Sequence, residues 1–235
     1  MIDIHSHLLY GVDDGAKTIE ESIDILRDLE RYGYNKIILT PHYIRGSAYN
    51  SPRRENVKRL QVLREALKEN NINIELYLGN EIYIDDELLD LFKSGTISTL
   101  NNTDYALIEL PMSGKYDDYK DIFAYLISKG CRVILAHPER YRSFQEDFNK
   151  VYELEKIGVL FQSNLDSIIG KYGEAAEKTI RRLLTEKKIA FLATDIHHKK
   201  HDYNHWDMAK QEILKYITEE EFKILTEDNP GQLVG

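Results

Sequence analysis

The chain has 235 residues, of which 42% are hydrophobic and 30% charged, values typical of a globular protein with a substantial core. Its net charge of −9 at pH 7 disfavours a nucleic acid partner, because phosphate backbones are bound by clustered Lys and Arg. We find no signal peptide and no apolar run near the roughly 20 residues that span a bilayer, so we expect a cytoplasmic protein without membrane insertion.

The first forty residues predict a βαβ unit. A short strand covers residues 1–4, and a helix opens at Thr18, which has the capping-box spacing to Glu21. Gly33 is a typical helix stop, and the apolar segment "NKIILT" after it reads as a buried strand.

The same alternation continues to the end of the chain. We expect helices at about 53–69, 85–94, 117–129, 147–157, 172–187, 203–216 and 219–226. Further strands are expected near 73–78, 105–109, 132–135, 159–162 and 190–193, which makes seven in all. Repeated βα units predict an α/β fold with a parallel sheet, and this number favours a closed barrel. Composition does not change along the chain, so we expect a single domain over residues 1–235.

Potential metal ligands or polar anchors follow every predicted strand. They are His5 and His7, His42, Glu81, Glu109, His137 with Arg140, Asn164, and Asp195 with His197. One such histidine alone is usually structural, but the carboxyl ends of parallel strands meet at one edge, so the set predicts a common site. His5 and His7 are two residues apart and project to the same side of a strand, from where both can reach one ion.

The residue types indicate the chemistry of this site. Imidazoles and carboxylates without a thiolate suit Mn²⁺, Fe or Zn²⁺, and the ligands outnumber what one ion can take. Closely spaced divalent ions commonly hydrolyse phosphate esters. Glu81 is the candidate bridging carboxylate, and Arg140 could clamp a phosphate or, with about equal weight, cap a helix at the surface.

Seven motifs in chain order now support a family resemblance. The segments are "DIHSH" followed by "DDG", then "TPH", "GNEIY", "YALIEL", "AHPERY" and "TDIH". They resemble the PHP (polymerase and histidinol phosphatase) superfamily, and more narrowly the bacterial manganese-dependent protein-tyrosine phosphatases of capsule and exopolysaccharide operons, the CpsB/CapC/YwqE type. The resemblance extends from residue 1 to the closing "DNPGQLVG".

The resemblance implies a distorted seven-stranded (β/α) barrel with three Mn²⁺ ions at the C-terminal mouth of the strands. One ion would be held by His5, His7, Glu81 and Asp195, a second by Glu81, Glu109 and His137, and a third by Asp14, His42 and His197. Asp13 is the less certain neighbour of Asp14. Arg140, Asp195 and His197 would carry catalysis.

The implied activity is removal of phosphate from phosphotyrosine on a partner tyrosine kinase of polysaccharide synthesis. A metal-bound hydroxide would attack phosphorus, Arg140 would orient the phosphate, and no phosphoenzyme would form. Independently of the family, cysteine-dependent tyrosine phosphatases need the spacing C-x5-R. The sixth residue after Cys131, the single cysteine, is His137, so Cys131 is interpreted as a core residue.

The sequence departs from the family after its last motif, where a glycine-arginine-proline stretch is replaced by "HHKKHDYNHW". Lys199, Lys200, His201 and His205 are candidates for the missing phosphate contact, and His198 is expected to face solvent. Nearby tyrosines could stack on a substrate ring, although ordinary half-buried tyrosines are the simpler interpretation of each. These tyrosines are Tyr43, Tyr83, Tyr116 and Tyr141.

Other functions stay open at this point. The same residues could act on a small phosphomonoester such as histidinol phosphate or on a nucleic acid end, or could hold metal in a weakly active regulator that binds the kinase. The loop "SGKYDDY" is a candidate contact for a protein partner, and the sequence leaves the oligomeric state open.

Overall fold

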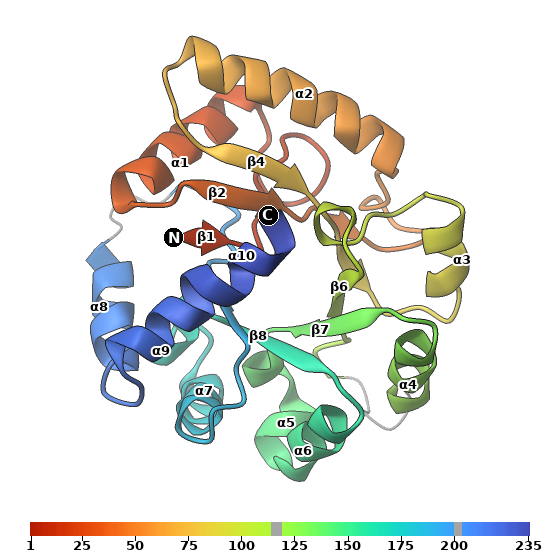
Figure 1. Cartoon of the computed structure of the whole chain (residues 1–235), viewed down its shortest axis with the longest axis vertical. Helices are drawn as coiled ribbons and strands as arrows, with labels where there is room; N and C mark the ends of the chain where they lie inside the picture. The colour runs from red at the N-terminus through yellow and green to blue at the C-terminus, as the bar shows by residue number, and fades with distance from the viewer. Residues whose placement is uncertain (114–118, 200–203) are drawn as a thin grey trace.

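The computed structural model describes residues 1–113, 119–199 and 204–235 (Figure 1). All of the strand pairs in these ranges are parallel, in one sheet of order β1-β2-β4 and another of order β3-β5-β6-β7-β8-β9. The strands are β1 (Ile2–Asp3), β2 (Lys36–Leu39), β3 (His42–Tyr43), β4 (Glu75–Leu78), β5 (Glu81–Tyr83), β6 (Tyr105–Glu109), β7 (Arg132–Ala136), β8 (Leu160–Asn164) and β9 (Phe191–Ala193). The fold is therefore α/β with parallel sheets.

The described residues form nine strands instead of the expected seven, because two expected strands are each followed closely by a short further strand in the other sheet. The strand of "NKIILT" leaves the first ladder at Pro41, which has no N–H to donate, and resumes as β3 in the second sheet. The strand at 73–78 likewise continues past Gly79 into β5. A Cβ at Gly79 would lie 2.6 Å from Leu100 Cδ2, so a larger residue at this bend would have to displace the Leu100 side chain. The described residues thus form two ladders instead of one closed ladder.

The helices surround the strands in Figure 1. They are α1 (Ile19–Tyr32), α2 (Arg53–Glu69), α3 (Leu88–Lys93), α4 (Lys120–Ser128), α5 (Arg142–Glu146), α6 (Asn149–Lys156), α7 (Glu174–Thr185), α8 (Asn204–Ile213), α9 (Glu219–Lys223) and α10 (Asn229–Val234), with a π-helical turn at Ile224–Asp228. Short 3-10 turns occur at Leu100–Asn102, Pro138–Arg140 and Leu165–Ile169. Each expected helix has a counterpart, whereas α5 and α10 were not expected.

Helix α1 begins and ends as its sequence predicts. The Thr18 side chain accepts a hydrogen bond from the Glu21 N–H, and Gly33 ends the helix with a φ of 101°. The Glu21 carboxylate accepts from the Lys17 N–H at 2.7 Å. This helix start holds the turn before it, which carries Asp13 and Asp14.

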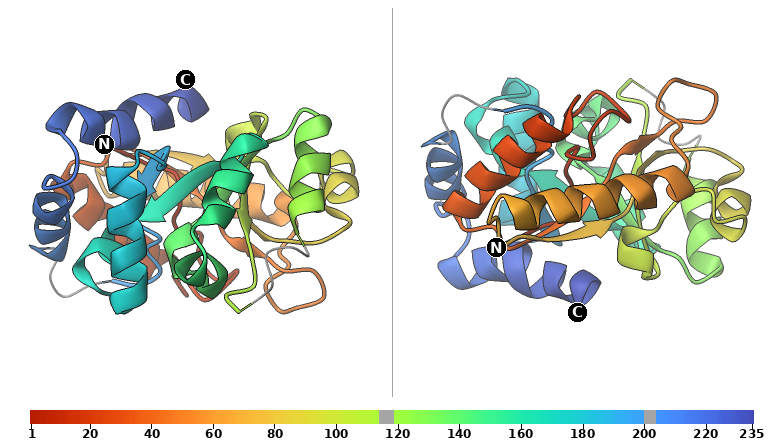
Figure 2. Two further views of the ribbon diagram at one scale, coloured as in Figure 1. Left: turned by 90° about the horizontal axis from the view of Figure 1, so that it is seen from below. Right: turned by 90° about the horizontal axis from the view of Figure 1, so that it is seen from above.

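Both faces of the strands are buried, and alternate residues face different clusters. Ile37, Ala106 and Val133 belong to the large cluster that includes the helices, whereas Ile38 and Leu107 belong to a smaller one. Near-continuous apolar strands are expected when helices cover one face and a filled interior the other. Leu233 and Val234 of α10 pack into the smaller cluster. Figures 1 and 2 show α9 and α10 crossing one end of the strands beside the N-terminus.

The two sheets come together at the carboxyl ends of β1 and β9. Ser6 and Ile196 form an isolated parallel bridge, and the Asp195 N–H donates to the His5 carbonyl at 2.9 Å. The Ser6 N–H donates to the Thr40 hydroxyl at 3.0 Å. The backbone bearing the expected metal ligands is therefore fixed from both sheets. Within the described residues, we find no helix with the length and apolar character to cross a membrane.

Candidate metal centre

The structure brings all nine expected metal ligands to one cluster, most of whose members are buried. Their ligand atoms form four overlapping groups, and within each group all of these atoms lie within 4.8 Å of one another. The groups are His7, Asp14, His42 and His197; His5, His7 and Glu81; His5, His137 and Asp195; and His42, Glu81 and Glu109. The ligands come from loops and strand ends of both sheets. The arrangement has the donor types and close spacing of a multi-ion site.

Glu81 at the start of β5 lies at the centre of the cluster. Its Oε2 atom is 3.3 Å from His5 Nε2, 3.2 Å from His7 Nε2 and 2.9 Å from His42 Nδ1. Its Oε1 atom is 2.9 Å from His137 Nε2. The side chain is 1% exposed, and burial alone would raise its pKa, but the surrounding histidines hold that pKa well below its usual value. An ionised carboxylate with one oxygen toward each side is placed to bridge ions.

His5 is oriented by a chain of hydrogen bonds along β8. Its Nδ1 lies 2.8 Å from Gln162 Oε1, the Gln162 amide donates to Asn164 Oδ1 at 2.9 Å, and the Asn164 amide donates to Asp195 Oδ2 at 2.7 Å. Gln162 and Asn164 are two residues apart, so both project from the same face of β8. Since the Gln162 oxygen can only accept, Nδ1 of His5 carries a proton and Nε2 is the nitrogen left to bind a metal ion.

His7 is oriented in the same way by Asp13. The distance from His7 Nδ1 to Asp13 Oδ2 is 2.9 Å, and Asp13 also accepts from the N–H groups of His42 and Gly15, both at 2.9 Å. Burial would raise the pKa of Asp13, but these hydrogen bonds lower it to about 2. A Cβ on Gly15 would lie 1.9 Å from the His7 carbonyl oxygen, so the tight turn requires glycine.

Asp14, His42 and His197 lie together, as the expected third ion site requires. Asp14 Oδ1 is 3.5 Å from His42 Nε2 and 3.7 Å from His197 Nε2. The His197 ring stacks on His7 at 3.9 Å between centroids. Burial and the neighbouring His7 lower the pKa of His197 to about 4, which favours the neutral imidazole that a metal ion needs.

Glu109 and His137 lie on the other side of Glu81. His137 Nε2 is 3.8 Å from Glu109 Oε1, and His42 Nδ1 is 3.9 Å from Glu109 Oε2. Burial and the charge of Glu81 raise the pKa of Glu109 to about 7. The two carboxylates therefore repel each other in a site that attracts positive charge.

Unpartnered polar atoms support metal binding at this cluster. Asp14 Oδ1 is buried without a hydrogen-bond partner among the described residues, and His42 Nδ1 and Glu81 Oε2, although 2.9 Å apart, do not have the geometry of a hydrogen bond. Burying such atoms costs roughly 1–3 kcal/mol each unless they are paired. Burial alone would lower the pKa of His5, yet Glu81 and Asp195 raise it to about 9, so the site attracts cations. The residues present fit divalent metal ions.

Arg140 reaches the cluster from the turn after β7. Its Nη1 donates to Asp195 Oδ2 at 3.2 Å, and its guanidinium lies over the Tyr172 ring, 4.4 Å from the centroid. The side chain is 26% exposed. These contacts place Arg140 at the edge of the metal cluster, which agrees better with a phosphate-binding role than with a surface arginine that caps a helix.

The other phosphate-binding candidates lie in the segment after His197, and the two that the structure describes make contacts away from the metal cluster. Lys199 pairs with Asp24 at 3.1 Å and His205 with Asp166 at 3.3 Å, so both make contacts outside the metal cluster. Lys200 and His201 lie outside the described residues. His198 is exposed, as expected.

The four candidate tyrosines near the site differ in their burial and contacts. Tyr141 is 1% exposed and its hydroxyl accepts from the Leu110 N–H, so its role is structural. Tyr43 is buried and Tyr83 half-buried, whereas Tyr116 and most of "SGKYDDY" fall outside the described residues. Sequence reasoning missed Tyr49, which stacks on His42 at 6.0 Å, and Tyr172.

Comparison with known proteins agrees with this geometry. The family model for capsular polysaccharide synthesis, CpsB/CapC, matches residues 1–235. The chain is 34% identical to the tyrosine-protein phosphatase YwqE of Bacillus subtilis over 222 residues, covering 94% of this chain and 85% of YwqE. It is 29% identical to the tyrosine-protein phosphatase CpsB of Streptococcus pneumoniae over 239 residues, covering 100% and 98%.

Solved structures give the same result for the fold. A chain from the crystal structures of YwqE of Bacillus subtilis and CpsB of Streptococcus pneumoniae, described as unique metal-dependent tyrosine phosphatases, matches with a TM-score of 0.90 and 31% identity, covering 100% of this chain and 94% of that one. An organophosphorus hydrolase from Deinococcus radiodurans, at 13% identity, shares the fold with a TM-score of 0.63, covering 100% and 92%. The chain belongs to the CpsB/CapC family of capsular polysaccharide synthesis proteins.

Proposed function

We propose that this protein is a metal-dependent protein-tyrosine phosphatase. The observation that carries the proposal is the position of Glu81, whose two oxygens lie within 3.3 Å of the side chains of His5, His7, His42 and His137. A carboxylate in this position is suited to join ions in a phosphate-hydrolysing centre. The relatives named as tyrosine-protein phosphatases support phosphotyrosine as the substrate.

We propose three divalent ions, Mn²⁺ in the first instance, with Fe or Zn²⁺ as alternatives that the same donors accept. His5, His7, Glu81 and Asp195 would hold one, Glu81, Glu109 and His137 a second, and Asp14, His42 and His197 a third, as their pair distances allow. When bound, the ions would activate water and polarise the phosphoryl oxygens.

The chain's own residues would orient the substrate and the ligands. Arg140, fixed by Asp195 and the Tyr172 ring, keeps further N–H donors for phosphate oxygens. Asp195 supports both His5 and Arg140, so it couples the metal ligands to the phosphate clamp. Cys131 takes no part, because burial raises the pKa of its thiol to about 11.

The biological setting that we propose is a cytoplasmic enzyme acting on a tyrosine kinase of polysaccharide synthesis. The capsular family and the single cysteine, typical of a reducing compartment, support this setting. We further propose that residues 1–235 are one domain and that the two sheets form a distorted barrel. The inner cluster of Ile38, Leu107, Ile134 and Leu233 supports that arrangement.

The test compares substrates on the Mn²⁺-loaded protein. We expect efficient release of phosphate from phosphotyrosine peptides and little from histidinol phosphate or 3′-phosphorylated oligonucleotides. Faster turnover of either alternative would refute the assignment, and absence of turnover in a metal-loaded protein would favour a regulator. His42→Ala should remove metal and activity together while the fold is retained by circular dichroism.

A further inference from the structure

A pocket of about 340 Å³ opens beside the metal centre. It is lined by Arg140, Lys171, Tyr172, Asp195, Ile196, His197, His198 and Lys199. Asp195 and His197 belong to the metal cluster, so the pocket adjoins the place where the phosphorus of a substrate would lie.

The pocket holds two cations around one aromatic ring. The Arg140 guanidinium lies 4.4 Å from the Tyr172 ring centroid and the Lys171 ammonium 4.9 Å from it. Lys171 also pairs with the buried Asp166 at 3.0 Å, and its side chain is 37% exposed. Asn164 supports the ring, since its amide donates to the Tyr172 hydroxyl at 3.4 Å. Tyr172 therefore fixes two cations whose remaining donors can reach the pocket.

The charges lining the pocket are mainly positive. Arg140, Lys171 and Lys199 carry positive charge at neutral pH, and the one lining carboxylate is Asp195, whose oxygens already face Arg140 and the cluster histidines. Asp166 neutralises part of Lys171 from beneath, and Asp24 pairs with Lys199. The lining residues thus include three cations and one carboxylate, in a chain whose net charge is −9.

We propose that this pocket binds an acidic side chain flanking the phosphotyrosine of the substrate, with Lys171 as the specificity-determining residue. The inference rests on the proposed function and names the substrate class within it. Arg140 lies on the Asp195 side and serves the phosphate, whereas Lys171 lies on the Asp166 side and has donors left for a second anion. Tyr172 is the positioning residue for both.

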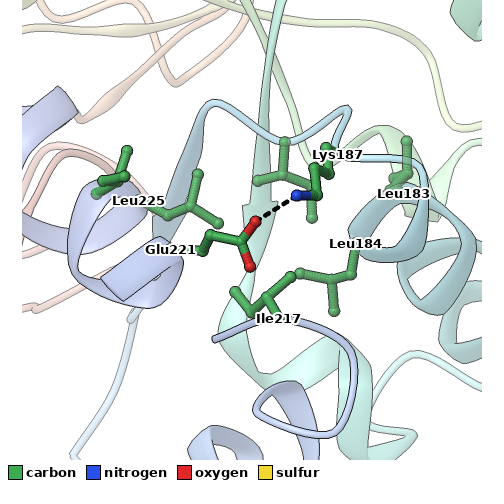
Figure 3. A pocket seen from close by; sticks show the side chains of 8 residues that line it. Leu183, Leu184, Lys187, Ile217, Glu221 and Leu225 are labelled. Carbon is green, nitrogen blue, oxygen red and sulfur yellow. Dashed lines mark ion pairs between the residues drawn. The ribbon is translucent and has the colours of Figure 1, made fainter. Parts of the chain in front are cut away.

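A second pocket provides a matched control. Lys187 pairs with Glu221 at 2.6 Å among the apolar side chains of Leu183, Leu184 and Leu225 (Figure 3). Like Lys171, Lys187 is a lysine paired with a carboxylate at a pocket, but no lining residue of that pocket belongs to the metal cluster. Lys187→Gln removes the same charge without touching the proposed subsite.

The experiment measures kcat/KM for phosphotyrosine peptides in which one flanking alanine at a time is replaced by Glu, Gln or Lys. The wild-type protein should prefer Glu over Gln about fivefold at one or more positions, as expected for a partly exposed ion pair of about 1 kcal/mol. The ratio should fall to about one in Lys171→Gln and favour Lys in Lys171→Glu, and it should stay at the wild-type value in Lys187→Gln. A ratio between two substrates is independent of the fraction of folded enzyme.

Tyr172 is tested by its conservative variant. Tyr172→Phe keeps the ring and should keep the wild-type ratio, whereas Tyr172→Leu should lower it and raise KM more than it lowers kcat. Equal turnover of the Glu, Gln and Lys peptides by the wild-type protein would overturn the subsite and leave the phosphatase intact. No turnover of any phosphotyrosine peptide, with turnover of histidinol phosphate, would overturn the proposed function itself.

Discussion

Replacing Asp13 by Asn would disturb the orientation of His7. Asp13 Oδ2 accepts from His7 and from the His42 N–H, while Oδ1 accepts from the Gly15 N–H. The asparagine would place its NH₂ group at one of the two oxygen positions, and at either position this donor would face a backbone N–H donor. If the amide nitrogen lies at the Oδ2 position it also donates to His7 Nδ1, which transfers the ring proton to Nε2 and blocks that atom as a ligand.

The structure gives the size of the effect. Loss of an outer hydrogen bond to a metal-binding histidine weakens metal affinity roughly 10- to 100-fold. In the metal-free protein, hydrogen bonds to His7 and backbone lower the pKa of Asp13 from 3.8 to about 2 against the effect of burial, which corresponds to about 2 kcal/mol of stability at neutral pH. Because the folded pKa is the lower one, wild type loses this stability as pH falls from about 4 to about 2, and its advantage over the variant disappears there.

The assay combines Mn²⁺ titration calorimetry with urea unfolding in EDTA, and Asp14→Asn is the control. The Asp14 side chain is 47% exposed and its Oδ1 faces His42 and His197, so its variant should lose metal with little loss of stability. The Asp13→Asn variant should lose both metal affinity and stability, and its activity should recover at saturating Mn²⁺. The reasoning would be refuted if the Asp13→Asn variant bound Mn²⁺ with wild-type affinity. It would also be refuted if the metal-free variant and the metal-free wild type were equally stable at pH 7.

Three further outcomes are expected. Glu81→Gln should reduce kcat by more than the roughly 10- to 100-fold cost of an outer hydrogen bond, measured at saturating Mn²⁺, because it removes the central carboxylate. Gly15→Ala should lower the free energy of unfolding by about 1–3 kcal/mol, since its Cβ would meet the His7 carbonyl at 1.9 Å, whereas Gly231→Ala, with open space around it, should be neutral or stabilising. Cys131→Ala should keep activity within about twofold, and thiol alkylation of wild type should not inhibit, because burial raises the thiol pKa to about 11.

Local sequence patterns predicted the elements well where periodicity and caps agreed. The expected helix at 53–69 corresponds to α2 (Arg53–Glu69), and the helix opening at Thr18 has its cap there. The same patterns could not show that two strands bend between sheets, because the bend at Gly79 depends on the close approach of Leu100 from another segment. Helix α10 was missed because its Leu233 and Val234 pack against strands more than a hundred residues away, such as the one containing Ile38.

Residues at the ends of the predicted strands were correctly expected to lie close together, since all nine expected metal ligands form one cluster. The supporting residues were harder to predict. Gln162 contacts a histidine 157 positions away, a partner that the sequence around β8 does not identify. Tyr172 lies after β8, whose end carries Asn164 but none of the nine expected metal ligands, and no motif marks this tyrosine. An ordered polar pair at Gln162 and Asn164 on one strand face was the available signal.

The supporting hydrogen bonds explain why the first seven residues alone could not form the centre. His5 and His7 share one side of the chain, but each also needs its proton held on Nδ1 so that both Nε2 atoms, 3.2 Å apart, are free to bind metal. Asp13 supplies that acceptor for His7 from the adjacent turn, and Gln162 supplies it for His5 from β8. Because the second acceptor comes from the six-stranded sheet and β1 from the three-stranded one, the paired histidines become competent ligands when the two sheets meet. Metal affinity should therefore report on that junction as well as on the ligands.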